Sequence, residues 1–198
     1  MLKKEIIWRE VLFQALEKKN NLFTQKALAD KFGYSLSTIF NALKAPREIK
    51  SIKVSGRNFK IINPQKFLYL WATLRRLDRD IIYQTHINEA VLQIEKQLPQ
   101  QVVFAAYTAC KKYISFVPAD YDKVYVYIQS AEIAEIQKRF PLKKGYSNLI
   151  ILRSDPLLDK YGQITTLAQT FVDLWNLEDW YADEFQKSLM EKVNAILA

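Results

Sequence analysis

The sequence is poor in residues that crosslink a chain, break it into loops or ligate metals. Its 198 residues include only four glycines and six prolines, which argues against long flexible stretches. The single cysteine, Cys110, excludes an intrachain disulfide, and the single histidine, His86, excludes a histidine-rich metal site. No apolar run approaches the ~18 residues of a membrane span, and Met1–Glu5 does not open an apolar signal peptide. We therefore expect a cytoplasmic protein without a membrane partner.

Glycine-rich phosphate loops and activated nucleophiles are also missing from the sequence. The chain has neither a P-loop nor the glycine-rich turn of dinucleotide-binding proteins. Nothing beside Cys110 marks its thiol as reactive, so we expect a buried structural cysteine. We accordingly predict no cofactor, no metal site and no catalytic residues.

Positive charge is abundant but is concentrated in the first part of the chain. Residues 1–80 contain 17 Lys and Arg against 7 Asp and Glu, whereas residues 81–198 contain 12 against 14. A basic front half joined to a near-neutral back half indicates that the front half meets a polyanion. DNA and an anionic membrane surface both satisfy this charge pattern, and a lysine-rich surface that only meets solvent satisfies it too.

The front half reads as three short helices with clear boundaries. Residues 4–19 place apolar side chains on one face, and Thr24 is a natural N-cap for a second helix. Gly33 supplies a sharp turn, and Ser35 caps a third helix that runs to about Leu43. Apolar residues at spacings of four predict two inward seams in this third helix. They are Ile39 with Leu43, and Leu36 with Phe40.

Residues 23–43 resemble the helix-turn-helix of bacterial and archaeal repressors. The resemblance rests on Leu28-Ala29, Gly33, Ser35 and the run Ser37-Thr38-Ile39. Such a turn lets the third helix project into a ~12 Å major groove of double-stranded DNA. A three-helix bundle with no DNA role is the alternative. The candidate DNA-binding residues on the outer face are short polar or cationic side chains: Ser35, Ser37, Thr38, Asn41 and Lys44.

A basic β-hairpin is expected directly after the third helix. Residues 49–54 alternate apolar and polar, residues 55–58 form a turn, and residues 59–62 form a second strand. Lys53, Arg57 and Lys60 on this hairpin are suited to backbone phosphates or a minor groove. A merely solvated hairpin is the alternative, but residues 49–66 contain no acid. We therefore predict a winged helix-turn-helix domain over residues 1–64.

The back half shows the pattern of a small α/β domain. Residues 65–84 read as a connector that begins with a helix and ends in a charged cluster. Over residues 85–198, strands near 102–104, 123–128 and 149–152 are separated by helices. The predicted fold class is thus α/β (α+β), with two domains joined by the connector.

The whole chain resembles the AbiEi-like antitoxins of type IV toxin–antitoxin systems. The supporting segments are residues 103–109 (Val-Phe-Ala-Ala-Tyr-Thr-Ala), 122–127 (Asp-Lys-Val-Tyr-Val-Tyr) and 164–174, which contain Thr-Phe-Val-Asp-Leu. The resemblance implies a repressor that binds its own promoter and a noncatalytic back domain related to nucleotidyltransferases. It also implies a nucleotidyltransferase-like toxin as genetic partner, although a stand-alone regulator would look the same. Because paired half-sites raise affinity, we expect a homodimer.

Two other functions remain open from the sequence. Asp120 and Asp122 precede a strand, as metal-binding carboxylates of a nucleotidyltransferase would, but the preceding turn is Ala105-Ala106 instead of Gly-Ser. An enzyme targeted by a winged helix is therefore the first alternative, and a solvated loop is the plain interpretation of the two aspartates. A winged helix that binds only protein is the second alternative.

Overall fold

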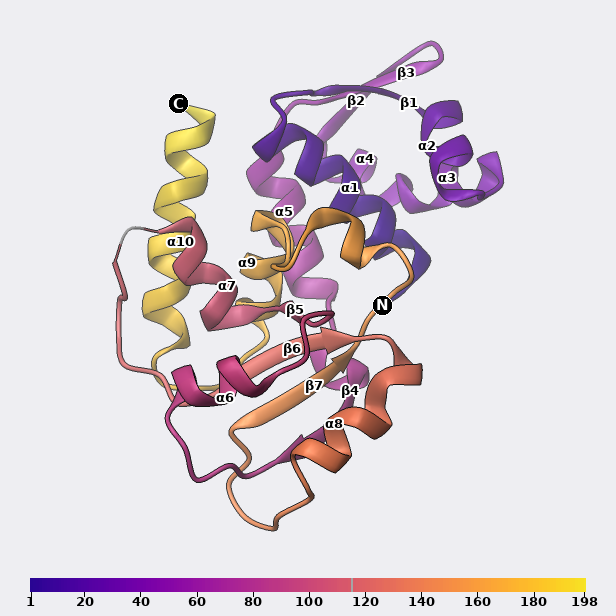
Figure 1. Cartoon of the computed structure of the whole chain (residues 1–198). Helices are drawn as coiled ribbons and strands as arrows, with labels where there is room; N and C mark the ends of the chain where they lie inside the picture. Colours follow the sequence, from indigo (N-terminus) through magenta and orange to yellow (C-terminus); the bar gives the residue numbers. More distant parts are fainter. Residues whose placement is uncertain (115) are drawn as a thin grey trace. The chain divides into compact units, whose positions relative to one another are not determined.

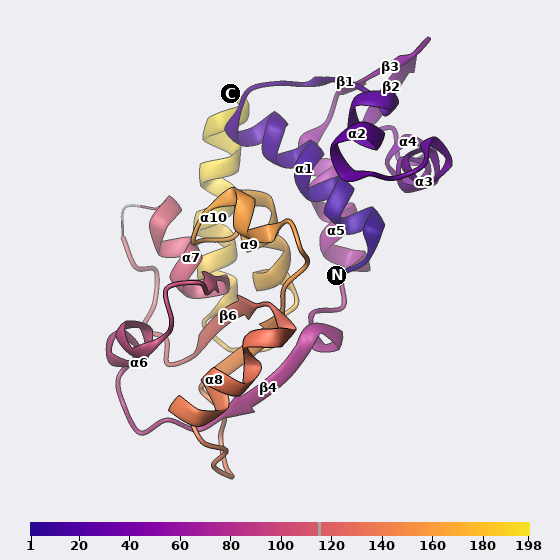
Figure 2. The same cartoon turned by 45° about the vertical axis from the view of Figure 1, so that its right-hand side comes forward.

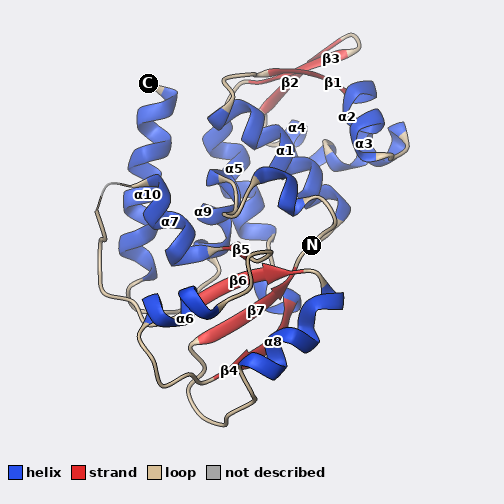
Figure 3. Ribbon diagram, viewed as in Figure 1, coloured by secondary structure: helices blue, strands red, loops and turns tan. Residues whose placement is uncertain are grey.

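The chain forms a mixed helix–strand structure with two small sheets (Figure 3). The computed structural model describes residues 1–114 and 116–198. Apart from the last two residues, its contacts divide the chain into a first unit, Met1–Arg75, and a second unit, Arg76–Ile196. Within the described residues, no helix is both long enough and apolar enough to cross a membrane.

The first unit contains five helices and extends further than expected. The helices are α1 (Lys3–Glu17), α2 (Gln25–Phe32), α3 (Leu36–Ala42), α4 (Lys44–Glu48) and α5 (Pro64–Leu74). We predicted a connector over residues 65–84, but α5 belongs to the first unit because it packs on α1. Its Phe67 ring meets Trp8 edge-on at 5.9 Å, and Trp71 donates to the Glu5 carboxylate at 3.3 Å. The first unit therefore ends at Arg75 and not at residue 64.

Local signals set the ends of α2 and α3 as the sequence indicates. The Thr24 hydroxyl accepts the Ala27 N–H at 3.0 Å, and the Ser35 hydroxyl accepts the Thr38 N–H at 3.2 Å. Gly33 ends α2 with φ of 64°, a left-handed conformation that glycine adopts without strain. Both caps and the glycine turn are thus confirmed, and they fix the angle between α2 and α3.

A three-stranded antiparallel sheet completes the first unit. Its strands are β1 (Leu22–Thr24), β2 (Ile52–Ser55) and β3 (Asn58–Ile61), in the order β1–β3–β2. The hairpin and its turn at Gly56 and Arg57 are confirmed, but β2 begins at Ile52 and not at Ile49. Phe23 and Phe59 stack at 5.2 Å on the inner side of this sheet. The alternate residues of β2 and β3 consequently face solvent.

The second unit is built on a four-stranded sheet. Its strands are β4 (Ile81–Thr85), β5 (Val103–Phe104), β6 (Val124–Ile128) and β7 (Leu149–Arg153), in the order β4–β7–β6–β5. The central pair, β6 and β7, is parallel, whereas β4 pairs with β7 and β5 pairs with β6 in antiparallel orientation. The helices are α6 (Val91–Gln97), α7 (Ala106–Tyr113), α8 (Ile133–Arg139), α9 (Leu167–Trp175) and α10 (Ala182–Leu197). Short 3-10 turns are η1 (Leu77–Asp80), η2 (Ser130–Glu132) and η3 (Leu158–Tyr161).

Helices cover both faces of this second sheet (Figures 1 and 2). Val126 of β6 packs in one core with Ile94 of α6 and Ile136 of α8. On the other face, the Tyr127 hydroxyl donates to Asp173 of α9 at 2.9 Å. The chain that leaves β6 therefore turns to one face, and the chain that leaves β7 turns to the opposite face.

Candidate functional sites

The exposed face of α3 carries small polar side chains. Ile39 and Leu43 are fully buried, so Ser37 and Asn41, on the other side of the helix, face solvent. Ser35 is exposed, but its hydroxyl caps the helix and lies 2.9 Å from the hydroxyls of Ser37 and Thr38. Thr38 is half-buried. Of the four polar positions predicted on this helix, Ser37 and Asn41 are therefore the best placed to meet a partner.

Leu36 and Phe40 do not form the second inward seam that their spacing predicts. Their side chains are 56% and 46% exposed, because a helix of seven residues presents only one face to α1 and Ile39, Ala42 and Leu43 already fill it. The Arg47 guanidinium lies 5.1 Å from the centre of the Phe40 ring. Sequence reasoning missed Phe40 as an exposed residue and missed its contact with Arg47, which is half-buried. It also missed α4, although Pro46 is compatible with a first helical turn.

Lysines face each other across the hairpin. Lys53 of β2 and Lys60 of β3 are register partners, and both side chains are exposed. Arg57 is exposed in the connecting turn. Like charges directly opposite each other on antiparallel strands destabilise the pair, and residues 49–66 include no acid to compensate. This hairpin therefore concentrates positive charge at a cost to its own stability.

The hairpin turn and α3 lie toward the same side of the first unit in both views (Figures 1 and 2). We call this surface the basic face. Under this name we group the eight residues predicted from the sequence at α3, at the start of α4 and on the hairpin: Ser35, Ser37, Thr38, Asn41, Lys44, Lys53, Arg57 and Lys60. Lys44 is exposed at the first position of α4. Cations flanking hydroxyl and amide groups make this surface chemically suited to a phosphate-bearing partner.

In the second unit, Asp120 and Asp122 lie at the edge of a pocket of about 580 Å³. Both aspartates are exposed, but Asp122 is held in place. Its carboxylate accepts hydrogen bonds from the Tyr181 hydroxyl at 2.6 Å and from the Tyr146 hydroxyl at 3.0 Å. Burial, followed by the bond to Asp122, raises the pKa of Tyr146 to about 12. This tyrosine therefore remains a hydrogen-bond donor over the physiological pH range.

Asp179 is the second anchored carboxylate of this pocket. It accepts the Tyr107 hydroxyl at 2.8 Å and the Tyr125 hydroxyl at 3.4 Å, and it pairs with the Lys123 ammonium. Burial and the contact with Asp179 raise the pKa of both tyrosines above the ordinary range. No spacing in the sequence links Asp179 to Asp122, so the sequence offered no signal for this cluster.

The described residues contain few groups suited to metal binding or thiol chemistry. Within positions 1–114 and 116–198, no three His, Cys, Asp or Glu side chains gather as a metal-binding group. Cys110 is fully buried on α7, and burial raises the pKa of its thiol to about 12. The thiol is therefore protonated at neutral pH, as expected for a structural cysteine.

Comparison with family models, with curated proteins and with solved structures gave no significant match. The chemistry of the basic face and of the pocket around Asp122 is consequently inferred from their own residues.

Proposed function

We propose that this chain is a DNA-binding transcriptional regulator. The observation that carries the proposal is the exposed Lys53–Lys60 pair, with exposed Arg57 in the adjoining turn of the hairpin that follows α3 and α4. A polyanion offsets the repulsion between the two lysines, so the arrangement gains stability when phosphates are bound. A surface that met only solvent would gain nothing from this placement.

The element order of the first unit supports a winged helix-turn-helix. Helices α2 and α3 are joined by the Gly33 turn, and the β2–β3 hairpin follows α3 and α4. Strand β1 joins the hairpin as the third strand of the sheet. In such a domain, α3 would enter the major groove and the hairpin would be the wing that contacts backbone or minor groove.

The residues of the basic face divide into two roles in this proposal. Lys44, Lys53, Arg57 and Lys60 contact phosphates and supply affinity without reading sequence. Asn41 has the amide that pairs with an adenine edge, and Phe40 offers an apolar contact for a thymine methyl group. Because α3 itself contains neither arginine nor lysine, base recognition would depend mainly on Asn41 and the small hydroxyls.

The resemblance to AbiEi-like antitoxins makes the proposed role more specific. The protein would be a cytoplasmic repressor that binds its own promoter as a homodimer, and its genetic partner would be a nucleotidyltransferase-like toxin. The back unit would have the nucleotidyltransferase-related fold without its chemistry. A nucleotidyltransferase-like reading frame next to this gene is the observation that would favour the antitoxin over a stand-alone regulator.

The direct test is binding of the full chain to a labelled random-sequence duplex, followed by fluorescence anisotropy at several salt concentrations. We expect the logarithm of affinity to fall linearly with the logarithm of salt, by about 0.9 per phosphate neutralised. Replacing Lys53, Arg57 and Lys60 together by Gln should flatten that slope by up to about 2.7. A charge-matched control replaces Lys138, Lys143 and Lys192, three exposed lysines of the second unit, by Gln.

Two results would overturn the proposal. One is an absence of duplex binding at low salt, and in that case a winged helix that binds protein becomes the better explanation. The other is an equal loss of binding in the two triple variants, which would show that binding depends on total positive charge and not on the basic face.

Sequence recognition is tested by selection from a random duplex library. Asn41→Ala should relax base choice at the contacted position, where about 1–3 kcal/mol of discrimination is at stake.

A second candidate function rests on the pocket that holds Asp120 and Asp122. Its volume of about 580 Å³ could accommodate a nucleotide, and carboxylates are the groups that bind Mg²⁺ in nucleotidyl transfer. Incubation with labelled nucleotide and Mg²⁺ tests for transfer. Activity that disappears in both Asp120→Asn and Asp122→Asn would establish the enzyme.

A further inference from the structure

A crevice opens where β6 and β7 end. These strands are adjacent and parallel, with Ile128 paired to Arg153 at their carboxyl ends. The chain continues from β6 into η2 and α8 on one face, and from β7 into η3 and α9 on the other. Parallel strands whose connections diverge in this way leave a crevice beyond their carboxyl ends, and open α/β sheets bind ligands there.

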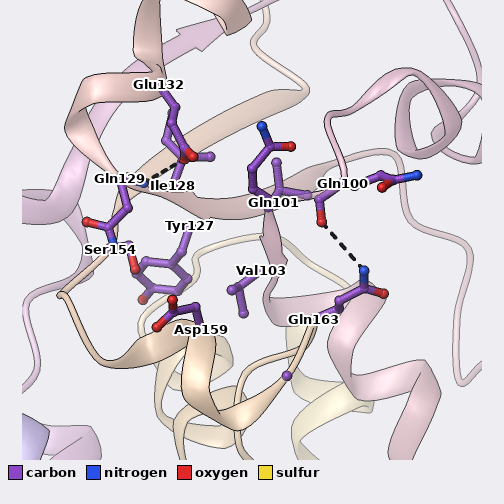
Figure 4. Close-up of a pocket in the computed structure, with 12 residues that line it drawn as sticks. Gln100, Gln101, Val103, Tyr127, Ile128, Gln129, Glu132, Ser154, Asp159 and Gln163 are labelled. Carbon is purple, nitrogen blue, oxygen red and sulfur yellow. Dashed lines mark hydrogen bonds between the residues drawn. The ribbon is translucent and has the colours of Figure 1, made fainter.

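A cavity of about 260 Å³ occupies this position (Figure 4). Gln129 and Glu132 come from the segment after β6, and Ser154 and Asp159 come from the segment after β7. Gln101, from the loop before β5, closes another side. Figure 4 shows these polar side chains arranged around Val103 and the ring of Tyr127. The cavity thus combines an apolar floor with a polar rim.

Hydrogen bonds hold the walls of the cavity in place. The Ser154 N–H donates to the Ile128 carbonyl at 2.8 Å, which joins the two strand ends. The Gln129 amide donates to the Asp155 carbonyl at 3.3 Å. The Gln163 amide donates to the Gln100 carbonyl at 3.5 Å, so the loop before β5 is tied to the segment before α9. The cavity is therefore preformed, which lowers the entropic cost of binding.

The charges in the lining restrict what this cavity can bind. Among the described residues that line it, Glu132 and Asp159 are the only charged side chains, and both are acidic. A phosphate group would lie near two carboxylates with no cation to offset the repulsion. The remaining polar groups are glutamine amides and the Ser154 hydroxyl, which both donate and accept hydrogen bonds. They suit a ligand without negative charge whose edge carries both donors and acceptors.

We propose that this crevice binds a small uncharged heterocycle of nucleobase or nucleoside size. The apolar face of the ligand would lie on Val103 and the ring of Tyr127. Its hydrogen-bonding edge would meet the polar lining groups, Gln101 among them. The cavity is slightly smaller than the roughly 300–1,000 Å³ typical of ligand pockets, which suits a single ring system better than a larger molecule. The site lies within the second unit and does not depend on the proposed DNA binding.

Isothermal titration of the full chain with four nucleosides, their 5′-monophosphates and glucose tests the proposal. At least one nucleoside should bind with a Kd below about 1 mM, and its monophosphate should bind about 10-fold more weakly because of the two carboxylates. Three results would overturn the proposal: no nucleoside binds in that range, glucose binds in preference, or the monophosphate binds as tightly as the nucleoside.

Matched variants assign the binding to this crevice. Gln101 is exposed, so Gln101→Ala should fold normally and weaken nucleoside binding about 3- to 10-fold, the effect of one lost hydrogen bond. Gln93→Ala, at an exposed position of α6 outside the cavity, should leave binding unchanged. Gln101→Arg should raise affinity for the monophosphate relative to the nucleoside. Equal behaviour of Gln101→Ala and Gln93→Ala would place the ligand elsewhere and overturn the assignment.

Discussion

Two serines of the α3 region, both candidate DNA-binding residues, have different structural roles. The Ser35 hydroxyl accepts the Thr38 N–H and so satisfies one backbone donor that the helix itself leaves without a partner. Ser37 lies inside the helix and points to solvent beside Asn41. A loss of DNA binding on mutation of Ser35 would therefore combine a folding effect with a contact effect. Mutation of Ser37 carries less of the folding effect, because Ser37 contacts the Ser35 hydroxyl but is not the N-cap residue.

Substitutions at Ser35 can separate these two effects. Ser35→Ala removes the cap and should lower the free energy of unfolding by about 0.5–2 kcal/mol. Ser35→Asp keeps a capping oxygen, so stability should stay near wild type, but its negative charge should weaken DNA binding by repelling phosphates. Urea unfolding measures stability and duplex anisotropy measures DNA binding. Ser37→Ala is the matched variant that removes the Ser35–Ser37 hydroxyl contact but keeps the capping residue. Undiminished DNA binding by Ser35→Asp would remove the N-terminus of α3 from the interface.

The hairpin makes a prediction at the scale of an element, because its function conflicts with its stability. Lys53→Thr relieves the repulsion from Lys60 and places a strand-forming residue in β2. Unfolding should then require about 0.2–1 kcal/mol more free energy, while DNA affinity falls and the salt slope flattens by about 0.9. Lys192→Gln, which removes one charge from α10, should leave the free energy of unfolding, the DNA affinity and the salt slope unchanged. A Lys53→Thr protein that is less stable than wild type would contradict the repulsion argument.

The sequence predicted elements best where side-chain pattern and capping agreed. Thr24, Gly33 and Ser35 define local backbone geometry by themselves, so α2 and α3 were placed within a residue or two. Strands β1 and β4 were not among the predicted strands. Strand β1 has only three residues and β4 lies at a sheet edge, so the pairing of each depends on partners distant in the chain. For the same reason, the bonds that join Asp179 to Tyr107 and Tyr125 appear only after folding.

At the scale of the whole molecule, the two units differ sharply in the groups that titrate at high pH. The groups with raised pKa values in the second unit include Cys110 and Tyr146, both at about 12, together with Tyr107, Tyr125 and Tyr181. Burial is the first cause in each case. These raised pKa values should therefore make the second unit less stable at alkaline pH.

When the pKa of a group is higher in the folded than in the unfolded protein, the group stabilises the fold at pH values below its unfolded pKa. This stabilisation is lost as the pH rises from the unfolded pKa to the folded pKa. For the second unit this loss begins near pH 9 with Cys110 and near pH 10 with the tyrosines, and it continues to about pH 12. Each excess proton bound by the folded state lowers the free energy of unfolding by about 1.4 kcal/mol per pH unit. The second unit should consequently unfold at lower urea concentration at pH 10.5 than at pH 8.

The four tryptophans allow each unit to be followed separately, since Trp8 and Trp71 belong to the first unit and Trp175 and Trp180 to the second. In protein labelled with 5-fluorotryptophan, the urea midpoint of the Trp175 and Trp180 resonances should fall between pH 8 and pH 10.5. The midpoint of the Trp8 and Trp71 resonances should fall less, because the groups with raised pKa values named above lie in the second unit. Cys110→Ala removes one titrating group, so the second unit should then lose stability less steeply above pH 9. An unchanged slope in that variant would show that its thiol titrates alike in the folded and unfolded chain.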